Sequence, residues 1–216
     1  MRHPFTTVRP ERLAPGAALV LTIASACATG AEPRIVRPGA PGEPSRVVGS
    51  GPTTAIRYTD ADVRFMQGMI GHHAQALEMT ALLRTRSQRD AMKLLAQRID
   101  VSQTDEIRTM RQWLQARGLE APDAHAHHAP GAPLMPGMLT ADEMATLAAA
   151  NGTAFDRLFL QYMIRHHEGA LVMVKELFAS PGAGQDADVN AFASDVEADQ
   201  AMEIGRMRAM LGGTGR

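Results

Sequence analysis

The sequence predicts an all-α protein: a four-helix bundle made of two duplicated helical hairpins, with a long crossover and a short extra helix between them. A set of chemically similar residues recurs 94 residues apart along the 216-residue chain. Within each copy the apolar residues follow a helical period, and no strand pattern competes with it. A single hairpin of amphipathic helices cannot bury its apolar faces, so the two copies are expected to pack together.

The duplication centres on two adjacent histidines. Its first copy contains Thr59, Asp62, Phe65, Met69, Ile70, His72, His73, Ala76, Leu77 and Met79. The matching residues of the second copy are Thr153, Asp156, Phe159, Met163, Ile164, His166, His167, Ala170, Leu171 and Met173. A later block, Gln103, Glu106, Ile107 and Met110, recurs as Gln200, Glu203, Ile204 and Met207 with an offset of 97. The additional three residues fall near a Ser-Pro-Gly turn that begins at Ser180, and turns tolerate insertions.

The N-terminal residues 1–26 have the pattern of an export signal. A basic stretch from Arg2 to Arg12 precedes an apolar run over residues 17–23. This run is too short to span a bilayer. Ala24-Ser25-Ala26 fits ordinary cleavage to a free secreted chain, but before Cys27 it also resembles a lipobox, which would make Cys27 the lipidated first residue. Both alternatives predict a periplasmic or cell-envelope protein that touches membrane only through its signal or a lipid anchor.

Residues 27–57 are rich in Pro, Gly and Ser and have no apolar period, which predicts a disordered tether. The duplicated domain follows over about 58–212, with copies at about 58–117 and 140–212 and a linker at 118–139. Long helices are expected at about 59–85, 88–117, 153–179 and 186–211, and a short one at about 140–150.

Two Thr-x-x-Asp pairs, Thr59 with Asp62 and Thr153 with Asp156, predict capped helix starts. A ligand role is the alternative for the two aspartates.

The paired histidines are the strongest chemical signal. Adjacent residues on a helix point about 100° apart, so one histidine of each pair is expected to face inward and the other to face along a seam. Imidazole with thioether favours Cu(I), whereas imidazole with carboxylate favours Cu(II) or zinc. The alternative is that they are hydrogen-bonded core residues without a metal. The histidines concerned are His72, His73, His166 and His167.

Two glutamates, Glu106 and Glu203, fall on the apolar arcs of the second and fourth long helices. A buried carboxylate needs a partner, which can be a neighbouring histidine, a metal ion or an arginine. Gln103 and Gln200 lie one turn earlier, where they can orient such groups.

The chain has fourteen methionines against nine aromatic residues. Those near the histidines serve either as soft metal ligands or as core filler; they are Met66, Met69, Met79, Met163 and Met173. The crossover carries His125-Ala126-His127-His128 and Met135-Pro136-Gly137-Met138. Such a tract either captures metal loosely or is plain solvated linker.

Several function classes are excluded. The net charge of −1 gives no electrostatic reason to expect nucleic acid. A single cysteine rules out an intrachain disulfide framework. No Glu-x-x-His occurs, which argues against a ferritin-type di-iron enzyme, and no catalytic constellation is recognised.

The doubled Met-Ile-x-His-His motif, together with Met135-Pro136-Gly137-Met138, resembles domain-of-unknown-function family three hundred and five over about residues 58–212. These are exported bacterial proteins with a ferritin-like helical fold. The resemblance implies copper binding and tolerance, as in the CopM-type periplasmic members, through the four histidines and neighbouring methionines.

The hypothesis is therefore an exported metal-binding protein that sequesters or transfers copper, as Cu(I) or Cu(II), with zinc as the lesser alternative. Its partners would be the metal ion and envelope copper-trafficking proteins. The competing functions are a metal-independent structural or interaction domain and a metal-dependent oxidase.

Overall fold

The computed structural model describes residues 34–37, 46–50, 58–126 and 134–213. They belong to two units, Met1–Thr53 and Thr54–Arg216. The expected export signal and the lipidation site at Cys27 lie outside the described residues.

In the first unit, β1 (Arg34–Arg37) pairs antiparallel with β2 (Arg46–Ser50), with an irregularity in register between Ile35 and Val36. The prediction of a tether without strands is therefore wrong for these nine residues. Both strands contain β-branched residues that favour extended backbone. They are too short for their pattern to stand out among the surrounding prolines and glycines.

The second unit is all-α, as predicted. Each of its helices begins and ends within two residues of the range expected from the sequence. They are α1 (Asp60–Arg86), α2 (Asp90–Ala116), α3 (Ala141–Ala149), α4 (Gly152–Ala179) and α5 (Ala187–Gly213). None of these described helices is both long and apolar enough to cross a bilayer.

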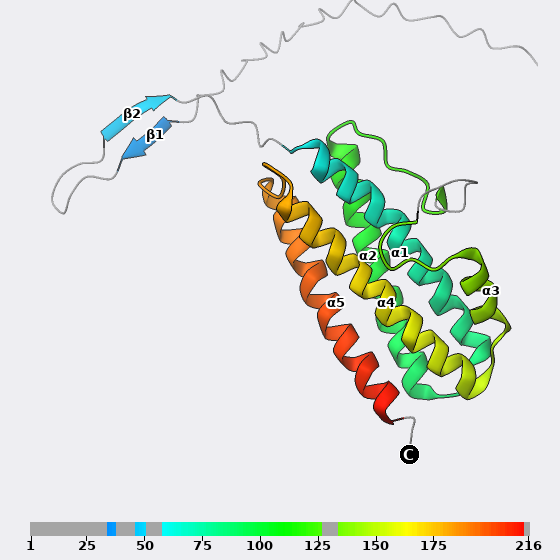
Figure 1. Cartoon of the computed structure of the whole chain (residues 1–216). Coiled ribbons are helices and arrows are strands. Elements are labelled where there is room, and N and C mark those ends of the chain that lie inside the picture. The colour runs from blue at the N-terminus through cyan, green and yellow to red at the C-terminus, as the bar shows by residue number, and fades with distance from the viewer. Residues whose placement is uncertain (1–33, 38–45, 51–57, 127–133, 214–216) are drawn as a thin grey trace, which may run out of the picture. The chain divides into compact units, whose positions relative to one another are not determined.

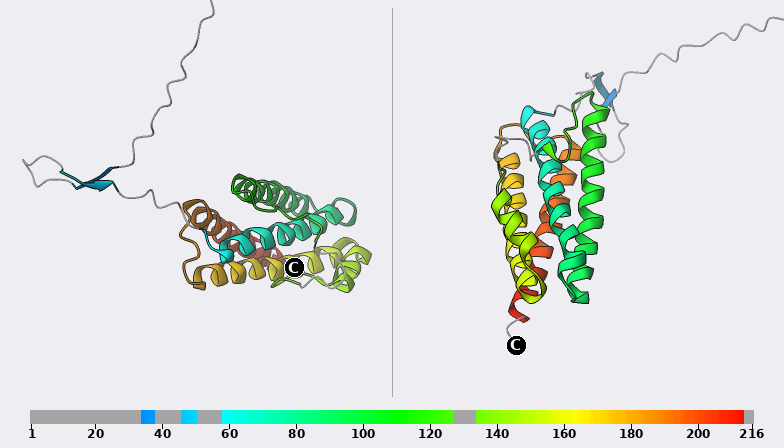
Figure 2. Two further views of the ribbon diagram at one scale, coloured as in Figure 1. Left: turned by 90° about the horizontal axis from the view of Figure 1, so that it is seen from above. Right: turned by 90° about the vertical axis from the view of Figure 1, so that its right-hand side faces the viewer.

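The two hairpins, α1–α2 and α4–α5, pack against each other mainly through α1 and α4. The short helix α3 touches both of these central helices (Figure 1). The four long helices run side by side in one bundle (Figure 2). The arrangement follows from the duplication, because each hairpin covers the apolar face that the other leaves open.

The start of α1 is capped as predicted. Thr59 accepts a hydrogen bond from the Asp62 amide, and Asp62 accepts one from the Thr59 amide, which completes a capping box. Asp62 also accepts a hydrogen bond of 2.7 Å from the amide of Gly184 in the α4–α5 turn. The aspartate therefore joins the two hairpins as well as capping a helix.

The second predicted cap, Thr153 with Asp156, is wrong. Helix α4 starts at Gly152, so Thr153 lies inside its first turn, and the capping position is taken by Asn151 without a side-chain cap. Asp156 is instead buried, with its Oδ2 3.7 Å from a guanidinium nitrogen of Arg89. The early start, with Gly152 at φ 58°, places the capping position two residues before Thr153 and so moves the Thr-x-x-Asp pattern into the helix.

The core consists of two apolar clusters that are related by the duplication. Phe65, Met69 and Met110 belong to the first, and their counterparts Phe159, Met163 and Met207 belong to the second. Each of the two central helices contributes to both clusters. The later part of α4, with Ala170 and Met173, lies in the first cluster, and the later part of α1, with Ala76 and Met79, lies in the second. Helices α1 and α4 therefore cross with an approximate two-fold relation, each giving one half to each cluster.

The end of the crossover, residues 134–139, lies along the seam between α1 and α4; we call it the strap. The Gln75 side chain donates to the carbonyl of Leu139 at 2.9 Å and accepts from its amide at 2.7 Å. A Cβ on Gly169 of α4 would lie 1.9 Å from the carbonyl oxygen of Pro136. The backbone of the strap therefore contacts the backbone of α4 at a distance that only a glycine at position 169 allows.

We predict that Gly169→Ala destabilises the protein by about 1–3 kcal/mol, because the new methyl group would force the strap away from α4. Gly205→Ala in α5 is the matched control, since its Cβ would meet nothing within 4 Å. This control should stabilise the protein by about 0.5–1 kcal/mol through helix propensity. Chemical denaturation measures both changes, and equal effects of the two substitutions would contradict the packing described.

Candidate metal centre

The four histidines form a polar layer between the two apolar clusters. His72, His73, His166 and His167 each have 0% exposure, and none belongs to either cluster. Neighbouring rings run across the bundle in the order His73, His72, His166, His167, with centroid separations of 6.3, 3.9 and 6.2 Å. The layer therefore coincides with the crossing of α1 and α4.

The outer histidines face α2 and α5. His73 donates Nε2–H to Glu106 of α2, and His167 donates Nε2–H to Glu203 of α5 at 2.6 Å. The glutamate side chains are 14% and 13% exposed, so they lie between the buried rings and solvent. The expectation that these carboxylates need a partner is thus met by histidine in both copies.

The inner histidines face each other under the strap. The rings of His72 and His166 are in contact, with their centroids 3.9 Å apart and a tilted interplanar angle of 39°. His72 also donates Nε2–H to the carbonyl of Pro136 at 3.0 Å. Adjacent histidines do point in different directions, as predicted, but both directions are buried because layers cover α1 and α4 on two sides.

These contacts determine where the imidazole lone pairs lie. A carbonyl or carboxylate oxygen only accepts, so a neutral histidine that donates from Nε2 carries its lone pair on Nδ1. This applies to His72, His73 and His167. A histidine that ligates a metal commonly donates its other ring N–H to such an oxygen, which orients the ring. Three of the four histidines therefore already have the partner that a ligand needs.

His166 has no such partner on a side chain or on the strap. Both of its ring nitrogens are buried without a side-chain hydrogen bond among the described residues, and the backbone of His72 is the hydrogen-bonding group that acts on its pKa. Burial, followed by the proximity of His72, His167 and His73, holds the pKa of His166 well below its usual value. The ring is thus kept neutral, with a lone pair in a site closed to water.

Gln103 and Gln200 continue the polar layer into α2 and α5. Each is 1% exposed, and Gln103 has no hydrogen-bond partner for either amide atom among the described residues. The Oε1 of Gln200 likewise lacks one. Unpaired buried amides cost about 1–3 kcal/mol each. The layer therefore contains hydrogen-bonding groups, on Gln103 and Gln200, that its described contacts leave unpaired.

The predicted methionines lie on both sides of this layer. Met66, Met69, Met79 and Met163 are at most 1% exposed and pack within the apolar clusters. Met173 is 8% exposed. This packing is what core filler requires, and the choice between core filler and a ligand role stays a prediction.

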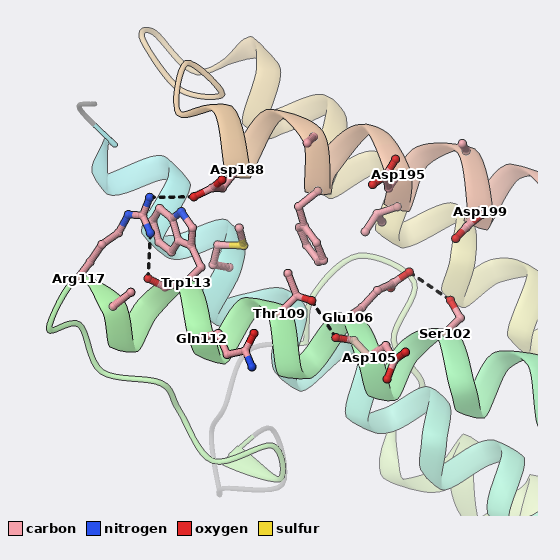
Figure 3. Close-up of a pocket in the computed structure, with 16 residues that line it drawn as sticks. Ser102, Asp105, Glu106, Thr109, Gln112, Trp113, Arg117, Asp188, Asp195 and Asp199 are labelled. Carbon is pink, nitrogen blue, oxygen red and sulfur yellow. Dashed lines mark hydrogen bonds and ion pairs between the residues drawn. The ribbon is translucent and has the colours of Figure 1, made fainter. Parts of the chain in front are cut away.

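On the far side from the strap, a cavity of about 730 Å³ opens between α2 and α5 (Figure 3). Glu106 lines it and accepts a hydrogen bond from Ser102, while Asp195 and Asp199 face it from α5. Burial, then the charges of Glu106 and Glu203, raises the pKa of Asp199. Glu106, Asp195 and Asp199 therefore give this cavity an acidic wall.

The sequence analysis missed Asp199 and Pro136. Asp199 corresponds to Ser102 in the other copy, so a search for repeated residues passes over it. The Pro136 contact is made by backbone, but Gly169 and Gly137 beside it were a usable signal of close approach.

In the part of the chain that the structure describes, no three histidine, cysteine, aspartate or glutamate side chains converge closely enough to hold one metal ion. The ligand set of four histidines and two glutamates is thus brought into one layer, but not onto one point. Further donors of another type, or side-chain movement, are needed to complete a site.

The histidine-rich part of the crossover lies apart from this layer. His125 is exposed and its Nδ1 is 2.9 Å from Glu78 on α1. His127 and His128 lie outside the described residues.

Family membership follows from the comparison with known proteins. Residues 62–211 match the family model described as Domain of unknown function (DUF305). The chain belongs to this family. Among curated proteins, none matches it.

Two solved structures of the family share the fold. A DUF305 fragment from Deinococcus radiodurans is 31% identical, with a TM-score of 0.61 over 72% of this chain and 97% of that one. The protein named putative secreted protein DUF305, from Streptomyces coelicolor, is 28% identical, with a TM-score of 0.62 over 72% and 94%.

A third relative has been solved with metals. CopM in its Cu(I)-bound form is 25% identical to this DUF305 protein, with a TM-score of 0.55 over 73% of this chain and 98% of CopM. Other structures of CopM are Cu(II)-bound, Ag-bound and apo.

We predict that His72, His73 and His167 are Nε2–H tautomers in the metal-free protein at about pH 8, because each donates to an oxygen. Nitrogen NMR of the imidazole rings distinguishes the two tautomers, and the exposed His125 is an internal reference. Finding Nδ1–H forms at His73 or His167 would contradict the hydrogen bonds to Glu106 and Glu203.

Proposed function

We propose that this DUF305 protein binds copper at the layer of four buried histidines. The observation that carries the proposal is His166, a fully buried imidazole whose two nitrogens have no side-chain hydrogen-bond partner among the described residues. A group of this kind costs free energy in the apo protein, and a metal ion that accepts its lone pair would recover it.

The chemistry of the layer supports copper over a hard cation. Neutral imidazoles bind copper and zinc well, whereas calcium and magnesium prefer oxygen ligands. The surrounding thioethers of Met69 and Met163 add soft donors within the same core. Glu106 and Glu203 orient the outer rings and offer oxygen ligands that would suit Cu(II).

The relatives support the same proposal. CopM shares the fold at 25% identity and has been solved with Cu(I) and with Cu(II). It is a distant relative, so its metals support the choice of copper and do not assign ligands to this chain.

We further propose that the protein acts in the cell envelope, by binding copper for sequestration or transfer and not by catalysis. The export pattern at residues 1–26 supports this location. Partner proteins would then be envelope copper carriers. A copper-loaded preparation that turned over oxygen or oxidised Cu(I) would contradict the binding role.

We predict that His166→Asn and His72→Asn each weaken Cu(I) binding by about tenfold or more, because each removes an imidazole of the inner pair. The affinity is measured without oxygen by competition against a chromophoric Cu(I) chelator. His125→Asn, on the exposed crossover, is the control and should bind as the unmodified protein does.

The competing function is a metal-independent bundle in which histidine–glutamate pairs only specify packing. It predicts that the same variants lose stability to unfolding while their copper affinity stays equal to that of the control. Unchanged affinity in both variants would end the copper proposal.

A further inference from the structure

The strap is placed against the two inner histidines by contacts along α1 and α4. Going along the strap, Met135 lies over Gly68, the carbonyl of Pro136 meets His72, and Leu139 is held by Gln75. Gly68, His72 and Gln75 are successive positions on one face of α1. The strap therefore follows that face and covers the seam in which His72 and His166 are in contact.

Met135 brings a sulfur atom to this face. Its Sδ lies 3.2 Å from the position that a Cβ of Gly68 would occupy. On an α-helix the side chains lean toward the N-terminus, so a ring at position 72 is directed toward the turn that contains Gly68. From this geometry we expect the thioether of Met135 and the imidazole of His72 to lie beside the same turn of α1.

A second thioether reaches the same place from α4. The Cε of Met173 lies 3.5 Å from that Cβ position of Gly68. Because Gly68 has no side chain, both methionine ends fit beside it. Met173 also lines a surface cavity of about 200 Å³ next to Phe65 and Leu177, so part of the Met173 side chain faces this cavity.

Met135 differs from the other methionines near the histidines. Met66, Met69, Met79 and Met163 are fully buried in the apolar clusters, whereas Met135 is only partly buried and packs at the edge of one of them. A thioether at an edge can turn toward an ion without leaving a cavity in the core.

We infer that Met135, with Met173 beside it, supplies thioether sulfur to a copper ion held by His72 and His166, so that the strap is part of the metal site. This inference rests on the proposed copper binding. Among the described residues, no three histidine or carboxylate side chains converge on one point, and the two thioethers would supply the additional donors that such a site needs. Thioether sulfur favours Cu(I), so the strap would make the site selective for Cu(I) over zinc.

The test compares Met135→Leu with Met92→Leu. Leucine keeps nearly the volume of methionine and removes the sulfur. Met92 of α2 is a fully buried methionine of the second cluster and makes none of the contacts with Gly68, His72 or Gln75 that hold the strap, so it is the matched control. We expect Met135→Leu to weaken Cu(I) binding by about tenfold, with zinc affinity changing less than threefold. Met92→Leu should change neither affinity.

X-ray absorption at the copper edge supplies a second measurement that does not depend on any variant folding. The unmodified Cu(I)-loaded protein should show sulfur scatterers, and Met135→Leu should show fewer. Copper surrounded by nitrogen and oxygen alone, or an unchanged affinity and spectrum in Met135→Leu, would overturn the inference.

The two proposals fail in distinguishable ways. If His166→Asn loses Cu(I) while Met135→Leu binds normally, copper binding stands and only the role of the strap is wrong. If neither substitution changes the affinity, the proposed function itself is wrong.

Discussion

Burying four imidazoles at the crossing of α1 and α4 is the constraint on which the rest of the structure depends. Each ring carries two polar nitrogens into a site closed to water, where an unpaired group costs about 1–3 kcal/mol. Glu106 and Glu203 pair with the outer rings, and the Pro136 carbonyl pairs with His72. The outer helices and the strap are thus positioned by what the histidines need, as much as by apolar packing.

The duplication explains why the site is nearly symmetric and why His72 and His166 nevertheless have different surroundings. Two hairpins provide two equivalent histidine–glutamate pairs and two matching apolar clusters. The crossover between the copies exists only once, however, so the Pro136 carbonyl reaches His72 and no equivalent carbonyl of the strap reaches its counterpart His166. His166 therefore lies where the two-fold relation fails, and its environment differs from that of His72.

Much of the fold was predictable, because it depends on local pattern and on repetition. The helical period located every long helix to within two residues, and the recurrence of Met-Ile-x-His-His predicted two packed hairpins. The cap at Thr153 was predicted wrongly, because the capping position is Asn151, two residues earlier, and the Thr-x-x-Asp pattern therefore lies inside the helix. The strands β1 and β2 were missed because they are short and lie between turn residues.

For the candidate site, residue identity predicted which side chains form the polar layer but not how they are arranged. The repeat indicated the four histidines and both glutamates, and the helical period predicted that adjacent histidines diverge. Which ring lies against which depends on the crossing of α1 and α4, and the partner of His72 is a backbone carbonyl, which has no residue signature. Gly169 and Gly137 were the sequence signals of that contact, because a Cβ on either one would clash with the backbone it faces.

The most direct test of the central claim is a crystal structure of the Cu(I)-loaded protein with anomalous scattering recorded at the copper edge. The account predicts a single strong peak between α1 and α4, within about 2.0–2.4 Å of a ring nitrogen of His72 or His166. Copper bound only on the surface or along the crossover, with the rings of His72 and His166 still in direct contact, would contradict it.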